Sequence, residues 1–232
     1  MSLLEIENLT AFYGDFQALF GISLSIDKGE TVAAIGANGA GKSTFLRSIT
    51  GLVQSDADKF LYKGETLKGK AACDIVGLGI AMVPEGRRLF PSLSVEENLI
   101  IGGYNQRPGN WTLERVYKMF PKLFERKDVA GTALSGGEQQ MVAIGRALMS
   151  NPDVLLCDEL SLGLAPIIIK DIYDALPSIK AEGISILVVE QDINQALAIA
   201  DRVYCFQEGR ISLSGKPDDL SKDQIAAAYF GR

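Results

Sequence analysis

One stretch decides the fold of this chain: Gly36-Ala37-Asn38-Gly39-Ala40-Gly41-Lys42-Ser43-Thr44. It matches the pattern G-x-x-x-x-G-K-[ST] of a phosphate-binding loop. An apolar, β-branched run at 31–35 precedes it and a helical pattern at 45–49 follows it, which is the context that the motif requires. The sequence therefore predicts a strand, a loop and a helix of an α/β core that binds a nucleoside triphosphate.

The residue types in this loop suit the chemistry of phosphate binding. Glycines let the backbone curl, so that successive N–H groups and the positive end of the helix face the phosphates. Lys42 is expected to reach the β- and γ-phosphates, and the Ser43 hydroxyl is expected to ligate Mg²⁺. The alternative is a Gly-rich turn that merely contains Lys-Ser, and the flanking strand and helix argue against it.

Composition excludes several other classes of protein. The chain has 232 residues, of which 47% are hydrophobic, which favours one domain with a sizeable insertion. Its 29 acidic residues outnumber 23 basic ones, so nucleic acid is not expected as a partner. The absence of histidine removes imidazole catalysis. The scattered Cys73, Cys157 and Cys205 favour reduced thiols over disulfides or a zinc site.

Targeting and membrane signals are not visible in the sequence. Residues 1–6 lack a basic region followed by an apolar stretch, as a secretory signal would have. No window reaches the roughly 18 uncharged apolar residues of a membrane span. We therefore expect a soluble, cytoplasmic protein that other subunits would hold if it works at a membrane.

Hydrophobic periodicity divides the chain into strands and helices. Alternation at 4–10 and 20–26 predicts half-buried strands. Nearly continuous apolar runs at 153–157 and 184–189 predict strands of a parallel sheet that is covered on both faces. The segments 202–206 and 210–214 flank a Gly-containing turn and predict a terminal hairpin.

The pattern becomes helical between residues 86 and 134. Ser94 followed by Glu97 predicts a capping box, and residues 112–127 have apolar positions at nearly helical spacing. We predict a single domain over 1–232 with a helical lobe inserted at 86–134. The expected fold is α/β, a phosphate-loop core with a mainly parallel sheet and an N-terminal antiparallel β portion.

Two adjacent acids, Asp158 and Glu159, end the apolar strand at 153–157. In this arrangement the Asp holds the Mg²⁺ shell, and the Glu orients or deprotonates the attacking water. The alternative is the start of a solvated loop. Two acids at the end of a buried strand are costly unless a cation or hydrogen-bond donors meet them, which favours the catalytic interpretation.

A second candidate anion site lies in Leu134-Ser135-Gly136-Gly137-Glu138-Gln139-Gln140, directly before a predicted helix at 138–150. Ser135 and the two glycines Gly136 and Gly137 would present N–H groups at that helix N-terminus. Ser135 and Glu138 also form a capping-box pattern. Both interpretations can hold together, because the cap leaves the N–H groups facing outward.

These motifs in this order resemble an ABC-type ATPase, the nucleotide-binding subunit of an ABC transporter. The resemblance covers essentially the whole chain and rests on 36–44, the region around Glu85, 134–140 and 154–159. It implies ATP and Mg²⁺ as cofactors, and a head-to-tail dimer with an identical or paralogous subunit. In that dimer Ser135, Gly136 and Gly137 would contact ATP bound by the other subunit. It also implies two membrane permease subunits that hold the chain at the inner face of the membrane.

The resemblance also implies roles for single residues. Tyr13 matches the aromatic that stacks on adenine, although the sequence alone equally allows a core tyrosine. Glu85 stands where the family usually has Gln, at a place in the metal shell. Gln191 replaces a histidine that contacts the γ-phosphate. The implied catalytic residues are therefore Lys42, Glu159 and Gln191.

Three departures from the family pattern, at Glu85, Ala165 and Gln191, resemble importer ATPases for branched-chain amino acids and their relatives for urea or amides. We therefore predict an ATP-hydrolysing subunit that powers a branched-chain amino-acid importer. The alternatives are an importer ATPase for urea or amides, and a non-transport ABC ATPase of DNA repair or translation. A regulatory module with little turnover is a third, and the intact Glu159 argues against it.

Two further positions stay open at this stage. The segment Arg87-Arg88-Leu89-Phe90-Pro91 offers charged and aromatic groups for docking a membrane partner, although a basic pair on a protein surface is usually just solvated. Leu160 stands where the family usually has proline, and the sequence explains no functional reason for the change.

Overall fold

A computed structural model describes residues 2–230 of the chain, which form two sheets. The first sheet has the strand order β2-β1-β5-β6, with β4 paired to β1, and its pairings are antiparallel. Its strands are β1 (Ser2–Tyr13), β2 (Phe16–Asp27), β4 (Gln54–Asp56), β5 (Lys59–Tyr62) and β6 (Glu65–Thr66). The predicted antiparallel N-terminal portion is confirmed.

The second sheet has the order β11-β10-β3-β9-β8-β7 and is parallel apart from the edge strand β11. Its strands are β3 (Thr31–Ile35), β7 (Ile80–Val83), β8 (Val154–Asp158), β9 (Ser185–Glu190), β10 (Arg202–Gln207) and β11 (Arg210–Gly215). Every residue of β3, β8 and β9 is buried. These continuous apolar runs form strands because helices and the first sheet cover both of their faces.

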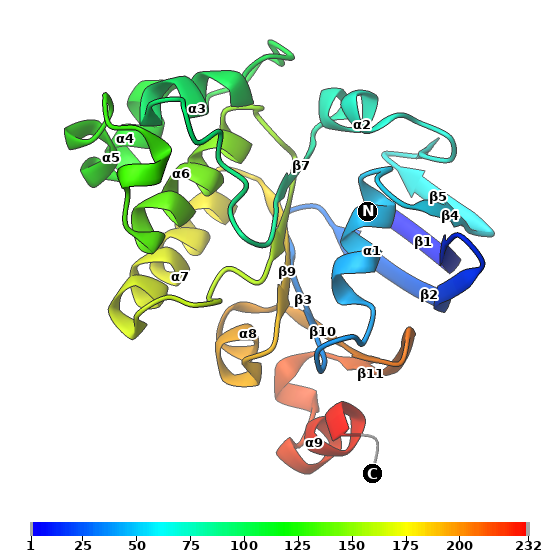
Figure 1. Cartoon of the computed structure of the whole chain (residues 1–232). Helices are drawn as coiled ribbons and strands as arrows, with labels where there is room; N and C mark the ends of the chain where they lie inside the picture. The colour runs from blue at the N-terminus through cyan, green and yellow to red at the C-terminus, as the bar shows by residue number, and fades with distance from the viewer. Residues whose placement is uncertain (1, 231–232) are drawn as a thin grey trace.

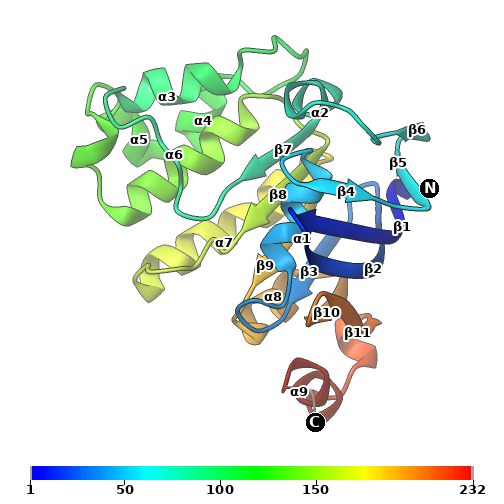
Figure 2. The same ribbon diagram turned by 45° about the vertical axis from the view of Figure 1, so that its right-hand side comes forward.

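Helices connect and cover the strands. They are α1 (Lys42–Ile49), α2 (Ala72–Leu78), α3 (Val95–Gly102), α4 (Leu113–Met119), α5 (Pro121–Glu125), α6 (Gly136–Leu148), α7 (Pro166–Ala181), α8 (Ile193–Ile199) and α9 (Lys222–Phe230). Figures 1 and 2 both show α3, α4, α5 and α6 gathered on one side of the second sheet, with the first sheet on the other. Residues 2–230 contain no helix whose length and hydropathy would let it cross a bilayer.

Three clusters of buried side chains hold these layers together. The first packs α1 between the two sheets, where the Phe45 and Phe206 rings lie 5.4 Å apart. The second joins α3–α7 to β7, β8 and β9, so the buried residues of 86–134 share one core with α6 and α7. The third packs α8 and α9 on β3 and β10.

The helical stretch at 112–127 divides into two helices. Phe120 has the non-helical angles φ −123° and ψ 76°, and Pro121 then occupies the first turn of α5. A proline ring disfavours the helical conformation in the residue before it, which explains the break. The apolar spacing still identified the inner face, because Val116 and Leu123 are fully buried. The predicted capping box of Ser94 at the start of α3 is confirmed.

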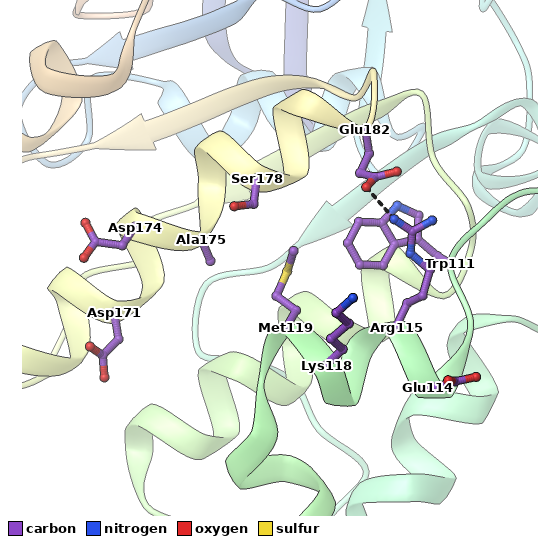
Figure 3. Close-up of a pocket in the computed structure, with 10 residues that line it drawn as sticks. All are labelled: Trp111, Glu114, Arg115, Lys118, Met119, Asp171, Asp174, Ala175, Ser178 and Glu182. Atoms are coloured by element: carbon purple, nitrogen blue, oxygen red, sulfur yellow. Dashed lines mark hydrogen bonds and ion pairs between the residues drawn. The ribbon is translucent and has the colours of Figure 1, made fainter.

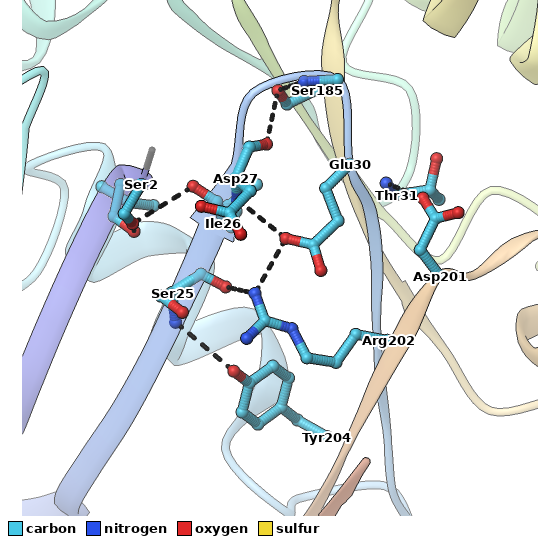
Figure 4. A network of polar contacts seen from close by, with 12 residues as sticks. Ser2, Ser25, Ile26, Asp27, Glu30, Thr31, Ser185, Asp201, Arg202 and Tyr204 are labelled. Atoms are coloured by element: carbon cyan, nitrogen blue, oxygen red, sulfur yellow. Dashed lines mark hydrogen bonds and ion pairs between the residues drawn. The ribbon is translucent and has the colours of Figure 1, made fainter. Parts of the chain in front are cut away.

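A polar network fixes the start of β3 (Figure 4). Arg202 Nη2 donates both to the Ser25 carbonyl at 2.9 Å and to Glu30 Oε2 at 2.8 Å. The Thr31 N–H donates to Asp201 Oδ2 at 2.7 Å. These bonds tie the turn before β3 to β2 and β10, and β3 then carries the chain to the phosphate loop at its other end.

Phe45→Ala should lower the free energy of unfolding by about 3–5 kcal/mol, because it opens a cavity in the core around α1. The measurement is urea unfolding without nucleotide. Leu52→Ala is the control, since Leu52 is 62% exposed and should change stability by less than about 0.5 kcal/mol. Equal effects of the two changes would contradict the packing described here.

Candidate nucleotide-binding site

The loop between β3 and α1 can be built only with its glycines. Gly39 and Gly41 have φ values of 79° and 103°, in the left-handed region that side chains disfavour. A Cβ on Gly36 would lie 2.4 Å from the carbonyl oxygen of Phe206. The Ala40 side chain is buried, whereas Ala37 and Asn38 are exposed. The loop therefore wraps around the N-terminal end of α1, with its tip open to solvent.

Lys42 is held in place by the same loop. Its side chain is buried, and Nζ donates to the carbonyls of Gly36 at 2.7 Å and Ala37 at 3.0 Å. Nζ also lies 3.9 Å from Glu159 Oε1. Burial lowers the pKa of Lys42, and the charges of Glu159 and Asp158 oppose that shift. The ammonium is therefore positioned before any phosphate binds.

Ser43 and Asp158 meet beside the loop. Ser43 Oγ donates to Asp158 Oδ1 at 2.9 Å. Asp158 is 1% exposed, and its Oδ2 has no hydrogen-bond partner. Burial raises the pKa of this carboxyl to about 6. The nearby charges of Glu159 and Glu85 add to the rise, and the hydrogen bond from Ser43 opposes it.

This geometry fits a magnesium ion. A buried carboxylate oxygen without a partner is costly, and a cation would satisfy it. Hydroxyl and carboxylate oxygens are ligands that Mg²⁺ accepts, together with substrate phosphates and water. Residues 2–230 hold no cluster of three or more acidic or cysteine side chains that could bind a metal unaided. The side chains that would hold the metal are Ser43 and Asp158.

Glu159 and Gln191 come from the ends of neighbouring parallel strands. Gln191 Nε2 donates to Glu159 Oε2 at 2.9 Å. Glu159 has a φ of 49°, which is uncommon for a residue with a side chain and occurs often at functional sites. The structure thus brings Lys42, Glu159 and Gln191 together, although 117 residues separate the first two and 32 the last two.

A cavity of about 430 Å³ opens next to the loop. Its lining includes Gly39, Gly41, Lys42, Ser43, Thr44 and Glu159, together with the aromatic residues Tyr13, Phe16 and Phe20. Tyr13 is 44% exposed, so it is not a core tyrosine. Its hydroxyl lies 3.4 Å from Thr44 Oγ1. The aromatic wall suits a nucleobase above the phosphate loop.

Sequence reasoning missed Phe16 in this wall. Phe16 is 69% exposed and lines the same cavity as Tyr13. The two aromatics flank the turn Gly14-Asp15 between β1 and β2. That turn signal beside two aromatic residues could have identified Phe16, since a tight turn brings its flanking residues together.

The second candidate anion site lies elsewhere in the chain. Ser135 caps α6 with Glu138, whose N–H donates to Ser135 Oγ at 3.3 Å, so the predicted capping box is confirmed. A Cβ on Gly137 would lie 2.5 Å from Ile168 Cγ2, which requires glycine there. The residues lining the cavity at the phosphate loop do not include Ser135, Gly136 or Gly137. Figure 1 shows α6 well apart from α1.

A larger cavity, about 760 Å³, lies between α4 and α7 and is drawn in Figure 3. Arg115 forms an ion pair with Glu182 there, and its guanidinium lies 5.5 Å from the Trp111 ring centre. The residues lining this cavity include none of the predicted site residues. Cavity size therefore does not locate the chemistry in this protein.

Comparison with known proteins agrees with the geometry at the loop. A family model described as ABC transporter matches residues 19–161. The chain belongs to this family. Its relatives include the high-affinity branched-chain amino acid transport ATP-binding protein BraG of Pseudomonas aeruginosa, which is 44% identical over 99% of this chain and 100% of the relative. Another relative is the probable branched-chain amino acid transport ATP-binding protein LivF of Archaeoglobus fulgidus, 34% identical over 94% of both chains.

Solved structures of the ABC family share the fold. The ADP conformation of an ATP-binding cassette of an ABC transporter superposes with a TM-score of 0.83 at 30% identity, covering 100% of both chains. A dimeric bacterial ABC transporter cassette superposes with a TM-score of 0.82 at 27% identity, covering 92% of this chain and 98% of that one. The predicted family and fold class are confirmed. The chain is an ABC ATPase, as the sequence predicted.

Asp158→Asn should raise the melting temperature of the nucleotide-free protein, because it removes a buried charge and still accepts the Ser43 hydrogen bond. The same change should abolish the further rise on adding MgATP, since that rise needs the carboxylate. Thermal unfolding with and without MgATP measures both effects. Asp218→Asn on the surface is the matched control. A variant that loses stability and still responds fully to MgATP would contradict this account of Asp158.

Proposed function

We propose that this ABC ATPase powers an importer for branched-chain amino acids, with the loop 36–44 and the residues around it as its hydrolytic site. The observation that supports this site is the position of Glu159. Its Oε1 lies 3.9 Å from Lys42 Nζ, and its Oε2 accepts a hydrogen bond from Gln191 Nε2 at 2.9 Å. That arrangement offers one carboxylate beside one cation and one amide donor. The name and the 44% identity of the Pseudomonas relative support the solute.

Each side chain has a distinct task in the proposed reaction. The N–H groups of 36–44 and the Lys42 ammonium bind the phosphates, and Tyr13 stacks on the base. Glu159 orients the attacking water and accepts its proton. The chain contains no histidine, so Gln191 would donate the hydrogen bond that an imidazole donates elsewhere in the family. Unlike an imidazole, its amide cannot become a cation.

Ser43 and Asp158 would hold Mg²⁺, with Glu85 at the edge of its shell. When bound there, the ion would supply positive charge that offsets the negative charge of the phosphates. The unpartnered Oδ2 of Asp158 supports this assignment. The charge of Glu85 acts on the pKa of Asp158, which supports its place nearby.

A second subunit completes the site in this proposal. Ser135, Gly136 and Gly137 lie at the N-terminus of α6, a helix of 13 residues, away from the cavity of their own chain. A head-to-tail partner, identical or paralogous, would bring its α6 N-terminus to the γ-phosphate. The dimeric cassette among the structural relatives supports this assembly.

Two permease subunits would dock on the helical lobe 86–134 and hold the ATPase at the inner face of the membrane. A groove of about 350 Å³ is lined by Arg88, Phe90, Ile101 and Tyr104, among others. The side chains of Phe90, Ile101 and Tyr104 are 46%, 41% and 86% exposed, as a docking surface requires. We infer that a permease segment fills this groove.

The two arginines that precede Phe90 differ in their surroundings. Arg87 donates from Nη2 to the Leu162 carbonyl at 3.2 Å, so it reaches the loop that follows Glu159. Arg88 is exposed and lines the groove. Their carbonyls accept hydrogen bonds from Arg146 at 3.0 and 2.8 Å. The hydrogen bond from Arg87 to Leu162 supports a route from the groove to the nucleotide site, through which a docked permease would sense the nucleotide.

Some relatives are named for other transported molecules, and these molecules are the alternatives to branched-chain amino acids. The lipopolysaccharide export ATP-binding protein LptB of Haemophilus influenzae is 31% identical over 100% of this chain. Urea or amide import is compatible with the same departures at Glu85, Ala165 and Gln191. The higher identity to the branched-chain relative is the reason to prefer that solute.

Glu159→Gln should keep ATP binding and lower the rate of hydrolysis by about 10²- to 10⁴-fold, because the proton acceptor is lost. MgATP should then trap a dimer, seen by size-exclusion chromatography with light scattering. Glu125→Gln, on an exposed turn of α5, is the matched control. A variant that hydrolyses ATP at the wild-type rate would contradict the role of Glu159. If the variant binds MgATP and still elutes as a monomer, the homodimer is excluded.

The solute is tested in the cells that produce the protein. Replacing the chromosomal copy with the Glu159→Gln variant should abolish uptake of radiolabelled leucine and leave urea and acetamide uptake unchanged. The reason is that two trapped ATP molecules hold the dimer in one state and stop the transport cycle. Unchanged leucine uptake with lost urea or acetamide uptake would replace the proposed solute.

A further inference from the structure

A buried carboxylate that sequence reasoning missed lies directly beside the hydrolytic site. Glu190 ends β9 and immediately precedes Gln191. It is 1% exposed, and in the parallel ladder it pairs with Ile35, the last residue before the phosphate loop. A buried carboxylate is costly unless donors meet it, so its partners show what it holds in place.

Three donors from two other elements meet this carboxylate. The Tyr173 hydroxyl donates to Oε1 at 2.6 Å, and the Ser161 N–H donates to the same oxygen at 3.2 Å. The Ser161 hydroxyl donates to Oε2 at 2.8 Å. Burial raises the pKa of Tyr173, and the charge of Glu190 adds to the rise, so the phenol remains a donor. Both oxygens of Glu190 are therefore satisfied.

The first of these elements is the loop that carries Glu159. The Glu159 N–H donates to the carbonyl of Val189, the residue before Glu190, at 3.0 Å. Leu160 is fully buried, so this position is an apolar anchor of the loop. Ser161 is then bound at both its N–H and its hydroxyl. The left-handed φ of Glu159 persists because the residues on either side are held.

The second element is α7, which also backs the second anion site. Tyr173 lies on this helix. Near its N-terminus, Ile168 occupies the space that a Cβ on Gly137 would need. Leu164 lies in the loop before the helix, and its Cδ2 would be 3.3 Å from a Cβ on Gly136. One carboxylate therefore fixes both the loop of Glu159 and the helix behind Gly136 and Gly137.

We propose that Glu190 is a positioning residue: by binding Ser161 and Tyr173 it sets where Glu159 stands relative to Gln191 and Lys42. Glu190 has no task on the substrate itself, and the proposal rests on the proposed role of Glu159 in hydrolysis. A carboxylate serves this purpose because it binds three donors in one geometry. An apolar residue of similar size would remove the buried charge but would leave those donors unpaired.

A purely electrostatic role is the competing explanation. The charge of Glu190 raises the pKa of Lys42, although burial lowers that pKa overall. If this charge were its main contribution, removing the hydrogen-bond donors around it would leave hydrolysis unchanged. If Glu190 acts by positioning, loss of one donor should lower kcat and leave the KM for ATP nearly constant, because the phosphate-binding groups stay in place.

The test removes the donors and keeps the carboxylate. Tyr173→Phe and Ser161→Ala should each lower kcat by about 10- to 150-fold, the range expected for losing one hydrogen bond to a charged group, with KM for ATP within about twofold of wild type. Tyr117→Phe is the matched control. Its hydroxyl donates to Glu96 Oε2 at 2.9 Å between α4 and α3, away from the hydrolytic site. This control should lower the melting temperature comparably and keep kcat.

A double-mutant cycle locates the effect. If Tyr173 acts through Glu159 and Gln191, the fall in kcat on adding Tyr173→Phe to Gln191→Ala should be smaller than the fall in the wild type. Independent, multiplicative effects would overturn the proposal. Wild-type kcat in both Tyr173→Phe and Ser161→Ala would overturn it as well, and leave the proposed function intact. A wild-type chain without ATPase activity would instead overturn the proposed function, and the role of Glu190 with it.

Discussion

The balance of charge around Lys42 is the constraint on which the rest of the structure depends. One buried ammonium lies near Asp158, Glu159 and Glu190, and all four groups have little contact with water. Burial alone lowers the pKa of Lys42 and raises that of Asp158. Both Glu190 oxygens and Lys42 Nζ are hydrogen-bonded, whereas the buried Asp158 Oδ2 has no hydrogen-bond partner and could meet a cation. This balance of charges suits the magnesium nucleotide that we propose for the site.

The order of the parallel strands makes this concentration of charge possible. The carboxyl ends of β3, β8 and β9 lie at one edge of the second sheet, so the phosphate loop, the acid pair and Gln191 meet there. The network of Arg202, Glu30 and Asp201 secures the opposite end of β3. Rigid strands then position side chains whose own loops carry left-handed backbone, as Glu159 does.

The same arrangement underlies the proposal that a second chain completes the candidate site. The elements at the carboxyl edge surround the phosphates from one side, whereas the N-terminus of α6 belongs to the helical side of the molecule. Glu190 lies between the two regions, bound to the loop of Glu159 and, through Tyr173, to the helix that backs Gly137. In our proposal these packed residues connect the helices to Glu159, and the hydrogen bond from Arg87 to the Leu162 carbonyl is a second contact.

The sequence by itself determined the features that depend only on residues close together in the chain. The loop 36–44, the buried strands and the helix caps at Ser94 and Ser135 follow from periodicity, backbone freedom and capping chemistry within a few residues. Local reasoning failed at Phe120, where the apolar spacing continued through a break that Pro121 imposes. Only the tertiary structure decided that Leu160 is an anchor and that Glu190 binds Ser161 and Tyr173. The physical reason is that an acid at the end of an apolar strand has the same local sequence whether solvent or distant donors meet it, and only the packing of the loop with Ser161 and of α7 settles which.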